Sequence, residues 1–194
     1  ATAALQLRHA RAADLRPIAE LLAEPTAPAA AGAFDWGAQA EVERWCRALP
    51  ARLAPRNDHM FAVIADEGTG AIVGVTELGK RTMTPAGARV AYIGNVAVGA
   101  SQRRSGVGRR LVGFACKWAR SRWDCADVFA HVEEDNAPAR ALYESLGFSA
   151  HVDVAGEGGS PGAVGGVEGG PLGALAGSRQ VLLVRRGGAR PTPS

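Results

Sequence analysis

The residues best suited to chemistry lie where a predicted strand, Val90 to Val98, runs into a basic, glycine-containing loop. The loop combines three arginines with two glycines: Arg103, Arg104, Gly106, Gly108 and Arg109. A predicted helix begins near Gly106, and a helix start presents backbone N–H groups without intrahelical partners, where the helix dipole favours an anion. Glycine lets a phosphate approach the backbone closely. The stretch therefore predicts a site for a phosphate-bearing ligand.

The loop differs from two common nucleotide-binding patterns. No Lys follows Gly108, as the P-loop requires, and the three-glycine Rossmann fingerprint is absent. These differences argue against nucleotide hydrolysis and NAD binding. By charge alone a solvated helix face explains the arginines equally well, since the net charge is only +3.

The same stretch resembles the acetyl-CoA signature of the GCN5-related N-acetyltransferase (GNAT) family. An R-x-x-G-x-G spacing, Arg103 to Gly108, follows the strand segment Val96 to Val98. Some thirty residues downstream, Asn136 to Phe148 resembles the family's N-x-x-A-x-x-L-Y-x-x-x-G-F element. The combination of these two motifs at this separation is specific for the family. The resemblance covers about Leu5 to Arg186.

The resemblance implies acetyl-CoA as the co-substrate and no metal. The backbone of Val96, Ala97 and Val98 would pair with the pantetheine arm like an added strand. Asn136 would bond near the pantetheine, and Tyr143 would lie beside the thioester sulfur. The pyrophosphate would be held at the helix start by Arg103, Arg104, Ser105, Gly106, Val107, Gly108 and Arg109.

Acetyl transfer to an amine needs a neutral nucleophile, donors for the oxyanion and a proton for the leaving thiolate. We expect a backbone N–H at Val96 or Val98 to donate a hydrogen bond to the oxyanion. The Tyr143 hydroxyl would donate a proton to the sulfur. A plain core aromatic is the alternative for Tyr143. Many family members carry a Glu base on the strand before the loop, but no carboxylate occurs from Tyr92 to Val98.

Tyr92 and His131 are the candidates for moving the amine proton. The NatE-type branch of N-terminal acetyltransferases has a Tyr and a His at the matching places, where they relay this proton through water. Histidine titrates near pH 6.5 and so accepts a proton at neutral pH. Two alternatives stay open: His131 as a strand residue bonded to a carbonyl, and Glu77, near the end of a predicted strand, as the base.

The predicted substrates are protein or peptide N-terminal α-amines, with lysine ε-amines as a second activity. The pKa of an α-amine is about 7.7–8.0 against about 10.4 for Lys, so far more of it is neutral at pH 7. A small-molecule amine acetyltransferase for arylalkylamines or polyamines is one alternative. A catalytically silent acyl-CoA-binding subunit that docks on ribosomes or another complex is another.

The Ala-, Gly- and Arg-rich sequence is also similar to plastid acetyltransferases, described as acetylating both protein N-termini and lysines. We therefore expect the plastid stroma, or otherwise the cytoplasm. No apolar run reaches the roughly 18 residues that span a bilayer, so no membrane partner is expected. Ribosome association is the one partner surface considered, and no specific nucleic acid is expected. Three cysteines without CxxC spacing predict neither disulfides nor a zinc site.

Hydrophobic periodicity predicts the elements that position these residues. Strands are expected at 5–8, 60–65, 71–78, 90–98, 128–132, 151–154 and 180–184. Helices are expected after a cap at Asp14, at 38–49, from 106 and at 136–146. This order predicts an α/β GNAT fold with a mixed central sheet of about seven strands flanked by four helices. Residues 1–186 are expected to form one domain with a flexible Gly-rich insertion at 155–178, followed by a disordered tail at 187–194.

Overall fold

The computed structural model describes residues 4–24, 36–54, 57–83, 88–151 and 180–187. The described strands are β1 (Leu5–His9), β2 (His59–Asp66), β3 (Ile72–Met83), β4 (Ala88–Val98), β5 (Val128–Glu133), β6 (Ser149–Ala150) and β7 (Gln180–Arg185). The described helices are α1 (Leu15–Ala23), α2 (Trp36–Leu53), α3 (Val107–Trp123) and α4 (Ala137–Glu144), with short 3-10 turns η1 (Ala12–Asp14) and η2 (Ala100–Gln102). The predicted order of elements is confirmed.

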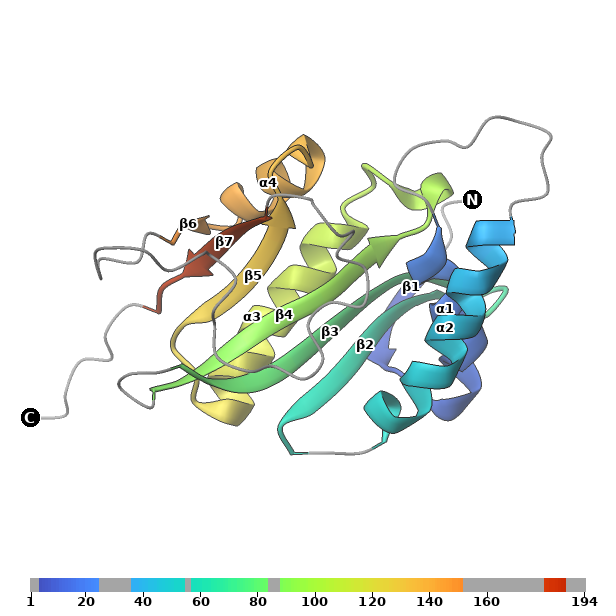
Figure 1. Cartoon of the computed structure of the whole chain (residues 1–194), viewed down its shortest axis with the longest axis horizontal. Coiled ribbons are helices and arrows are strands. Elements are labelled where there is room, and N and C mark those ends of the chain that lie inside the picture. Colours follow the sequence, from blue (N-terminus) through green and yellow to red (C-terminus); the bar gives the residue numbers. More distant parts are fainter. Residues whose placement is uncertain (1–3, 25–35, 55–56, 84–87, 152–179, 188–194) are drawn as a thin grey trace, which may run out of the picture. The chain divides into compact units, whose positions relative to one another are not determined.

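The seven strands form one mixed sheet in the order β1-β2-β3-β4-β5-β7-β6 (Figure 1). The β4–β5 pair is parallel, whereas β1–β2, β5–β7 and β6–β7 are antiparallel. A parallel pair needs a crossover connection, and α3 supplies it between β4 and β5. The predicted fold class, a mixed sheet with four helices, is therefore confirmed.

The chain forms two compact units that alternate along the sequence. The first contains Ala1–Glu77 and Asn95–Leu111, and the second contains Leu78–Gly94 and Val112–Ser194. Strands β3 and β4 and helix α3 each contribute residues to both.

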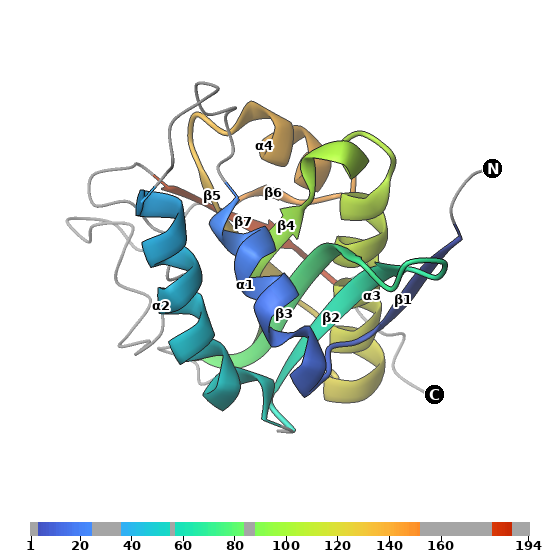
Figure 2. The same cartoon turned by 90° about the vertical axis from the view of Figure 1, so that its right-hand side faces the viewer.

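In the first unit, α1 and α2 run side by side and pack on each other, and α2 also packs on β2 (Figures 1 and 2). Their inward side chains are apolar and buried, with Ile18 and Leu49 at 0% exposure and Trp45 at 3%. A second apolar cluster joins Ile64 of β2 to the first turn of α3. Burial of apolar area, at about 25 cal/mol per Å², stabilises both layers.

In the second unit, β5 and β7 pair along their length, from Val128 with Arg185 to Glu133 with Gln180. A cluster of Val90, Phe129 and Val184 forms its apolar centre. Tyr92 packs against this cluster. The second unit therefore fixes the two strands that carry Tyr92 and His131.

Several element bounds differ from the prediction. Helix α2 continues to Leu53 through Pro50, and β3 continues to Met83, well beyond the predicted end at 78. The last hairpin strand was predicted at 151–154, but β6 is Ser149–Ala150 and pairs with Val184 and Leu183. Phe148, buried at 4% exposure, anchors the chain directly before β6, which draws the strand toward the end of α4. Residues 152–154, the predicted insertion 155–178 and the tail from 188 lie outside the described residues.

Asp14 was predicted to cap α1, but its carboxylate makes other bonds. It accepts two hydrogen bonds from the Arg8 guanidinium, at 2.6 and 2.9 Å, and one from the Arg11 backbone N–H at 2.7 Å. The bonds from Arg8 outweigh burial and lower the pKa of Asp14. Asp14 thus ties β1 to the start of α1 by a side-chain ion pair.

Within the described ranges, no helix is long and apolar enough to cross a membrane. The three cysteines, Cys46, Cys116 and Cys125, are free thiols. Among the described residues no group of three or more His, Cys, Asp or Glu is placed to hold a metal ion.

Candidate active site

The predicted phosphate loop lies between the end of β4 and the start of α3. The first bond of helical type runs from the Arg110 N–H to the Gly106 carbonyl, at 3.1 Å. The backbone amides of Gly106, Val107 and Gly108 precede it, and these are the amides that a helix start leaves for other partners. Residues 103–106 are exposed, so the loop can be reached by a ligand.

Two loop residues adopt left-handed backbone conformations. Gly106 has φ +89°, where glycine carries no steric cost, and an added Cβ would meet no atom within 4 Å. Arg104 has φ +67°, which is uncommon for a residue with a side chain. Such strain often occurs at binding sites.

A close contact between β3 and α3 sets the position of this helix start. A Cβ at Gly74 would lie 2.7 Å from the Val107 Cγ1 and 3.0 Å from the Leu111 Cδ1. Only glycine therefore allows the first turn of α3 to sit this close to β3. The first turn of α3 is therefore held against β3.

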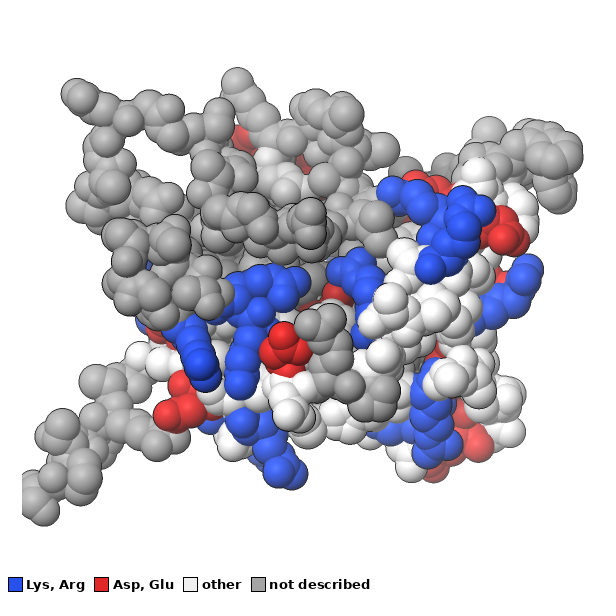
Figure 3. Space-filling model, turned by 60° about the horizontal axis from the view of Figure 1, so that its bottom comes forward, with Lys and Arg blue, Asp and Glu red and all other residues white. Residues whose placement is uncertain are grey.

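Arg103, predicted to add charge for the phosphate, also ties the loop together. Its Nε donates to the Val98 carbonyl at 3.2 Å, and its Nη2 lies 3.4 Å from the Glu24 carboxylate. Glu24 also accepts from the Ala100 N–H at 3.1 Å. On the face shown in Figure 3, blue Lys and Arg side chains lie among red Asp and Glu side chains. In the loop itself, Arg103 is partly balanced by Glu24, and the start of α3 is the feature that suits an anion.

Asn136 and Tyr143 lie at the two ends of α4. Asn136 is the N-cap, and its Oδ1 accepts from the Ala139 N–H at 3.1 Å. Tyr143 is 4% exposed and packs edge-on against Phe148, with ring centroids 5.1 Å apart. Burial raises the pKa of the Tyr143 hydroxyl, and the nearby ionisable groups of Tyr92 and Cys116 act in the same direction. This hydroxyl stays protonated at neutral pH and can donate a proton.

The structure brings Tyr92 and His131 together. The Tyr92 hydroxyl lies 2.7 Å from the His131 Nδ1, and the ring centroids are 5.7 Å apart. The two strands pair beside them, with Tyr92 opposite Phe129. Burial lowers the pKa of His131, so its imidazole is neutral at pH 7. A neutral imidazole bonded to a phenol can accept a proton passed through that phenol.

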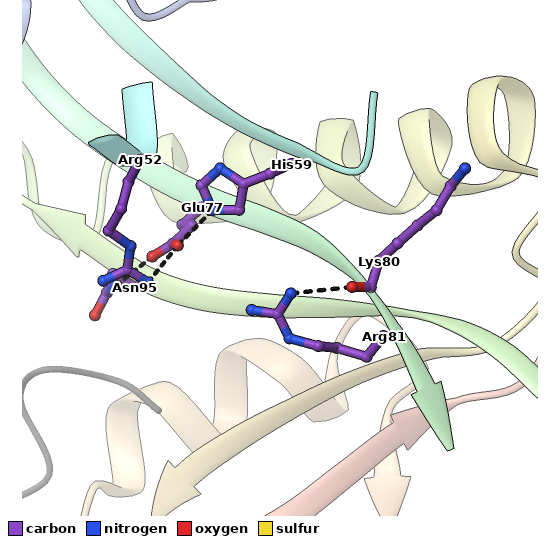
Figure 4. A network of polar contacts seen from close by, with 6 residues as sticks. All are labelled: Arg52, His59, Glu77, Lys80, Arg81 and Asn95. Carbon is purple, nitrogen blue, oxygen red and sulfur yellow. Dashed lines mark hydrogen bonds and ion pairs between the residues drawn. The ribbon is translucent and has the colours of Figure 1, made fainter. Parts of the chain in front are cut away.

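Glu77, the alternative base, is at the centre of a buried polar cluster on β3 (Figure 4). One carboxylate oxygen binds the Arg52 Nη2 at 2.5 Å and the His59 Nε2 at 2.6 Å, and the other accepts from the Asn95 Nδ2 at 2.5 Å. Burial opposes ionisation, but these donors together outweigh it and hold the pKa of Glu77 below its usual range. A carboxylate stabilised in this way is a weak base, and Glu77 is buried rather than half-exposed.

Sequence reasoning did not single out Arg52, His59 or Asn95. They lie 25, 18 and 18 residues from Glu77 along the chain, on three different elements. No local spacing announces such a cluster, because it depends on tertiary packing of α2, β2, β3 and β4. The position of Asn95 directly before Val96 is the signal in the sequence that could have indicated it.

The fold is of the predicted α/β class, and the candidate site holds groups that can donate and accept protons. The model of the Acetyltransferase (GNAT) family matches residues 24–148. The chain therefore belongs to this family, whose members use acetyl-CoA, and it is a GNAT-family N-acetyltransferase.

A curated relative is the "GCN5-related N-acetyltransferase 7, chloroplastic" of Arabidopsis thaliana, 38% identical over 58 residues. The match covers 30% of this chain and only 21% of that relative.

Solved structures share the fold. Glucosamine-6-phosphate N-acetyltransferase from Arabidopsis thaliana superposes with a TM-score of 0.58 at 18% identity, over 79% of this chain and 97% of that one. A chain of the NatC complex bound to Gag peptide and CoA gives a TM-score of 0.63 at 16% identity, over 94% and 98%. The two neighbours carry different substrates in their names, so the fold alone leaves the substrate open.

Proposed function

We propose that this enzyme acetylates protein N-terminal α-amines by direct transfer from acetyl-CoA in a ternary complex, with lysine ε-amines as slower substrates. The observation that carries the proposal is the 2.7 Å contact between the Tyr92 hydroxyl and the His131 Nδ1. No carboxylate of the described β4 segment competes for the role of base, since 88–98 contains none.

The proton leaves the amine through Tyr92 and His131. The Tyr92 O–H donates to Nδ1 of neutral His131, so the phenol oxygen is left to accept a proton from the amine or from a bridging water. As the amine nitrogen bonds to the acetyl carbon, one proton passes to the phenol oxygen and the phenol proton passes to Nδ1. His131 becomes cationic and later returns the proton to solvent.

Tyr143 supplies the other proton. Its hydroxyl has a raised pKa and is held in place by Phe148. When the carbon–sulfur bond breaks, the Tyr143 O–H donates to the leaving sulfur and regains its proton from solvent. One proton is lost by nitrogen and one is gained by sulfur, so the transfer is balanced.

The residues of the loop fit the acetyl-CoA pyrophosphate. The exposed segment 103–106, open space at Gly106 and the amides of Gly106, Val107 and Gly108 match an anion at a helix start. Arg104, Ser105 and Arg109 would add donors, and Arg103 would hold the loop. The backbone groups of Val96, Ala97 and Val98 would pair with the pantetheine arm. Asn136, which caps the start of α4, would lie near the same arm. Acetyl-CoA would supply the activated acetyl group.

The preference for α-amines follows from the modest strength of this relay. About a tenth of α-amines are neutral at pH 7, against fewer than about one in a thousand lysines. A neutral His131 suffices for the first group, because it removes a proton only after attack. NatC, the complex solved with a Gag peptide, shows that this fold can accommodate a peptide substrate.

Two further points belong to this proposal. The chloroplastic relative supports the plastid stroma as the place of action. Ribosomes, which present nascent N-termini, are the partner surface we propose, because a chain with net charge +3 suits an anionic partner.

The experiment is acetyl transfer onto a mixed peptide library, with α-amines and lysines scored separately by mass spectrometry. We expect α-amine products to dominate. Tyr92→Phe and His131→Ala should each lower kcat/KM by about 100-fold. Values within twofold of the wild type for both variants would remove the relay.

A further inference from the structure

The buried carboxylate of Glu77 fixes the side-chain amide of Asn95 in one orientation. Glu77 is 3% exposed, and its low pKa keeps it ionised at neutral pH. An ionised carboxylate only accepts hydrogen bonds, so the Asn95 group that faces it at 2.5 Å must be the NH2. The amide oxygen of Asn95 then points away from Glu77, as Figure 4 shows.

That oxygen is an acceptor without a hydrogen-bond partner among the described residues. Asn95 is half-buried, unlike the buried Thr76 and Glu77 of the neighbouring strand. Glu77 itself is held by Arg52 and His59, whose side chains are 18% and 11% exposed. Withdrawing the three side chains of Glu77, Arg52 and His59 from water costs desolvation free energy, which apolar side chains in the same space would not cost. This cost suggests that the orientation of the Asn95 amide has a function.

Asn95 lies on β4 between residues proposed to bind the cofactor and to move the proton. It directly precedes Val96, the first residue of the proposed pantetheine strand, and follows Tyr92 by three residues on β4. The negative charge of Glu77 polarises the Asn95 amide and makes its oxygen a stronger acceptor. Such an acceptor suits an N–H donor such as a neutral amine.

We propose that the Asn95 Oδ1 accepts a hydrogen bond from the amine that is to be acetylated, and that Glu77, Arg52 and His59 are positioning residues that aim it. The inference rests on the proposed function and adds a substrate-binding residue to it. Asn95 takes no proton, so Tyr92 and His131 remain the relay. The hydrogen bond would orient the amine so that its lone pair is free for attack.

A pantetheine amide is a neutral N–H donor that competes for the same acceptor. The two occupants are separated by measuring the affinity for each ligand.

The test is a four-way binding cycle on the CoA-bound enzyme, in which no acetyl group is present. Wild type and Asn95→Ala are each titrated with the best peptide of the library and with its des-amino analogue, in which hydrogen replaces the α-amine. We expect Asn95→Ala to weaken the amine peptide about tenfold and the des-amino peptide less than twofold. CoA affinity should stay within twofold.

Glu77→Gln tests the positioning role while Asn95 stays in place. Glutamine can donate as well as accept, so the Asn95 amide is no longer held in one orientation. The amine peptide should lose several-fold in affinity and the des-amino peptide little. Thr76→Val, on the same strand, is the matched control, because Thr76 is fully buried and its Oγ1 has no partner among the described residues.

Three results would overturn the inference. Asn95→Ala could weaken both peptides equally, it could weaken CoA as much as the amine peptide, or it could leave all three unchanged. If Asn95→Ala does not fold, the Glu77→Gln arm decides by the same criteria. Failure of the proposed function looks different, since wild type would then acetylate no peptide at all.

Discussion

At the scale of single residues, the buried cluster around Glu77 and the half-buried pair of Tyr92 and His131 have opposite tasks. The Glu77 cluster keeps a charge ionised in an apolar place, where each partner is needed to offset desolvation. The Tyr92–His131 pair keeps an imidazole neutral, because burial disfavours its charged form. The Glu77 cluster stabilises the fold and orients Asn95, whereas the Tyr92–His131 pair can accept a proton.

Replacing Glu77 should reveal its contribution to folding. Glu77→Gln leaves the mostly buried Arg52 charge without its partner, and the free energy of unfolding should fall by about 3 kcal/mol at pH 7. In the wild type the pKa of Glu77 is below its ordinary 4.5, so this stabilisation is present above pH 4.5 and is lost as the pH falls further. Urea unfolding at pH 7 and below pH 4 measures both quantities. Equal pH dependence in the two proteins would contradict the assignment.

His131 should impose a pH limb on catalysis. Its pKa is below the ordinary 6.5, so kcat with saturating peptide should fall only as the pH drops below 6.5. His131→Gln should remove this limb and lower kcat about 100-fold. His9→Gln, at an exposed position of β1, is the control that should leave the profile unchanged. A wild-type midpoint above 7 would show that another group titrates.

At the scale of elements, glycines decide where α3 begins and how it meets the sheet. Gly74 on β3 leaves room for Val107, and Gly106 turns the chain into the helix. The sequence predicted the helix and its loop, because apolar spacing and the Gly pattern are local. The role of Gly74 could not be predicted, since it depends on a contact more than thirty residues away.

Two glycine substitutions should therefore act in opposite directions. Gly74→Ala places a Cβ 2.7 Å from the Val107 Cγ1 and should lower the free energy of unfolding by about 1–3 kcal/mol. Gly113→Ala, in the interior of α3 with nothing within 4 Å of its Cβ, should raise it by about 0.5–1 kcal/mol. Thermal unfolding of both variants compares the two. Similar changes of the same sign would refute the packing argument.

Arg104 offers a separation of strain from binding on the same loop. Its left-handed backbone costs about 1 kcal/mol or more for a residue with a side chain, so Arg104→Gly should stabilise the fold. If its guanidinium helps to hold the pyrophosphate, the same change should weaken CoA severalfold, and more at low salt. Calorimetric titration with CoA and thermal unfolding measure the two effects. Unchanged CoA affinity would assign Arg104 a structural role alone.

At the scale of the whole molecule, the order of elements and the mixed sheet follow from sequence periodicity, and the structure confirms both. The first and last residues of the strands do not follow from periodicity, because the neighbouring strands set them. Strand β3 continues to Met83, and β6 ends at Ala150. In the candidate site, Tyr92, His131 and Tyr143 were selected through family spacing, and their catalytic roles stay a prediction. Asn95, Arg52 and His59 were not, since charge partners on separate elements leave no periodic trace.

The most direct test of the account is acetylation of the mixed peptide library by wild type and His131→Gln at pH 7.5, with acetyl-CoA as the only acyl donor. We predict that wild type modifies α-amines well ahead of lysines, that His131→Gln loses about 100-fold of this rate, and that CoA affinity is the same in both proteins. Equal rates for the two proteins, or products on lysines alone, would contradict it.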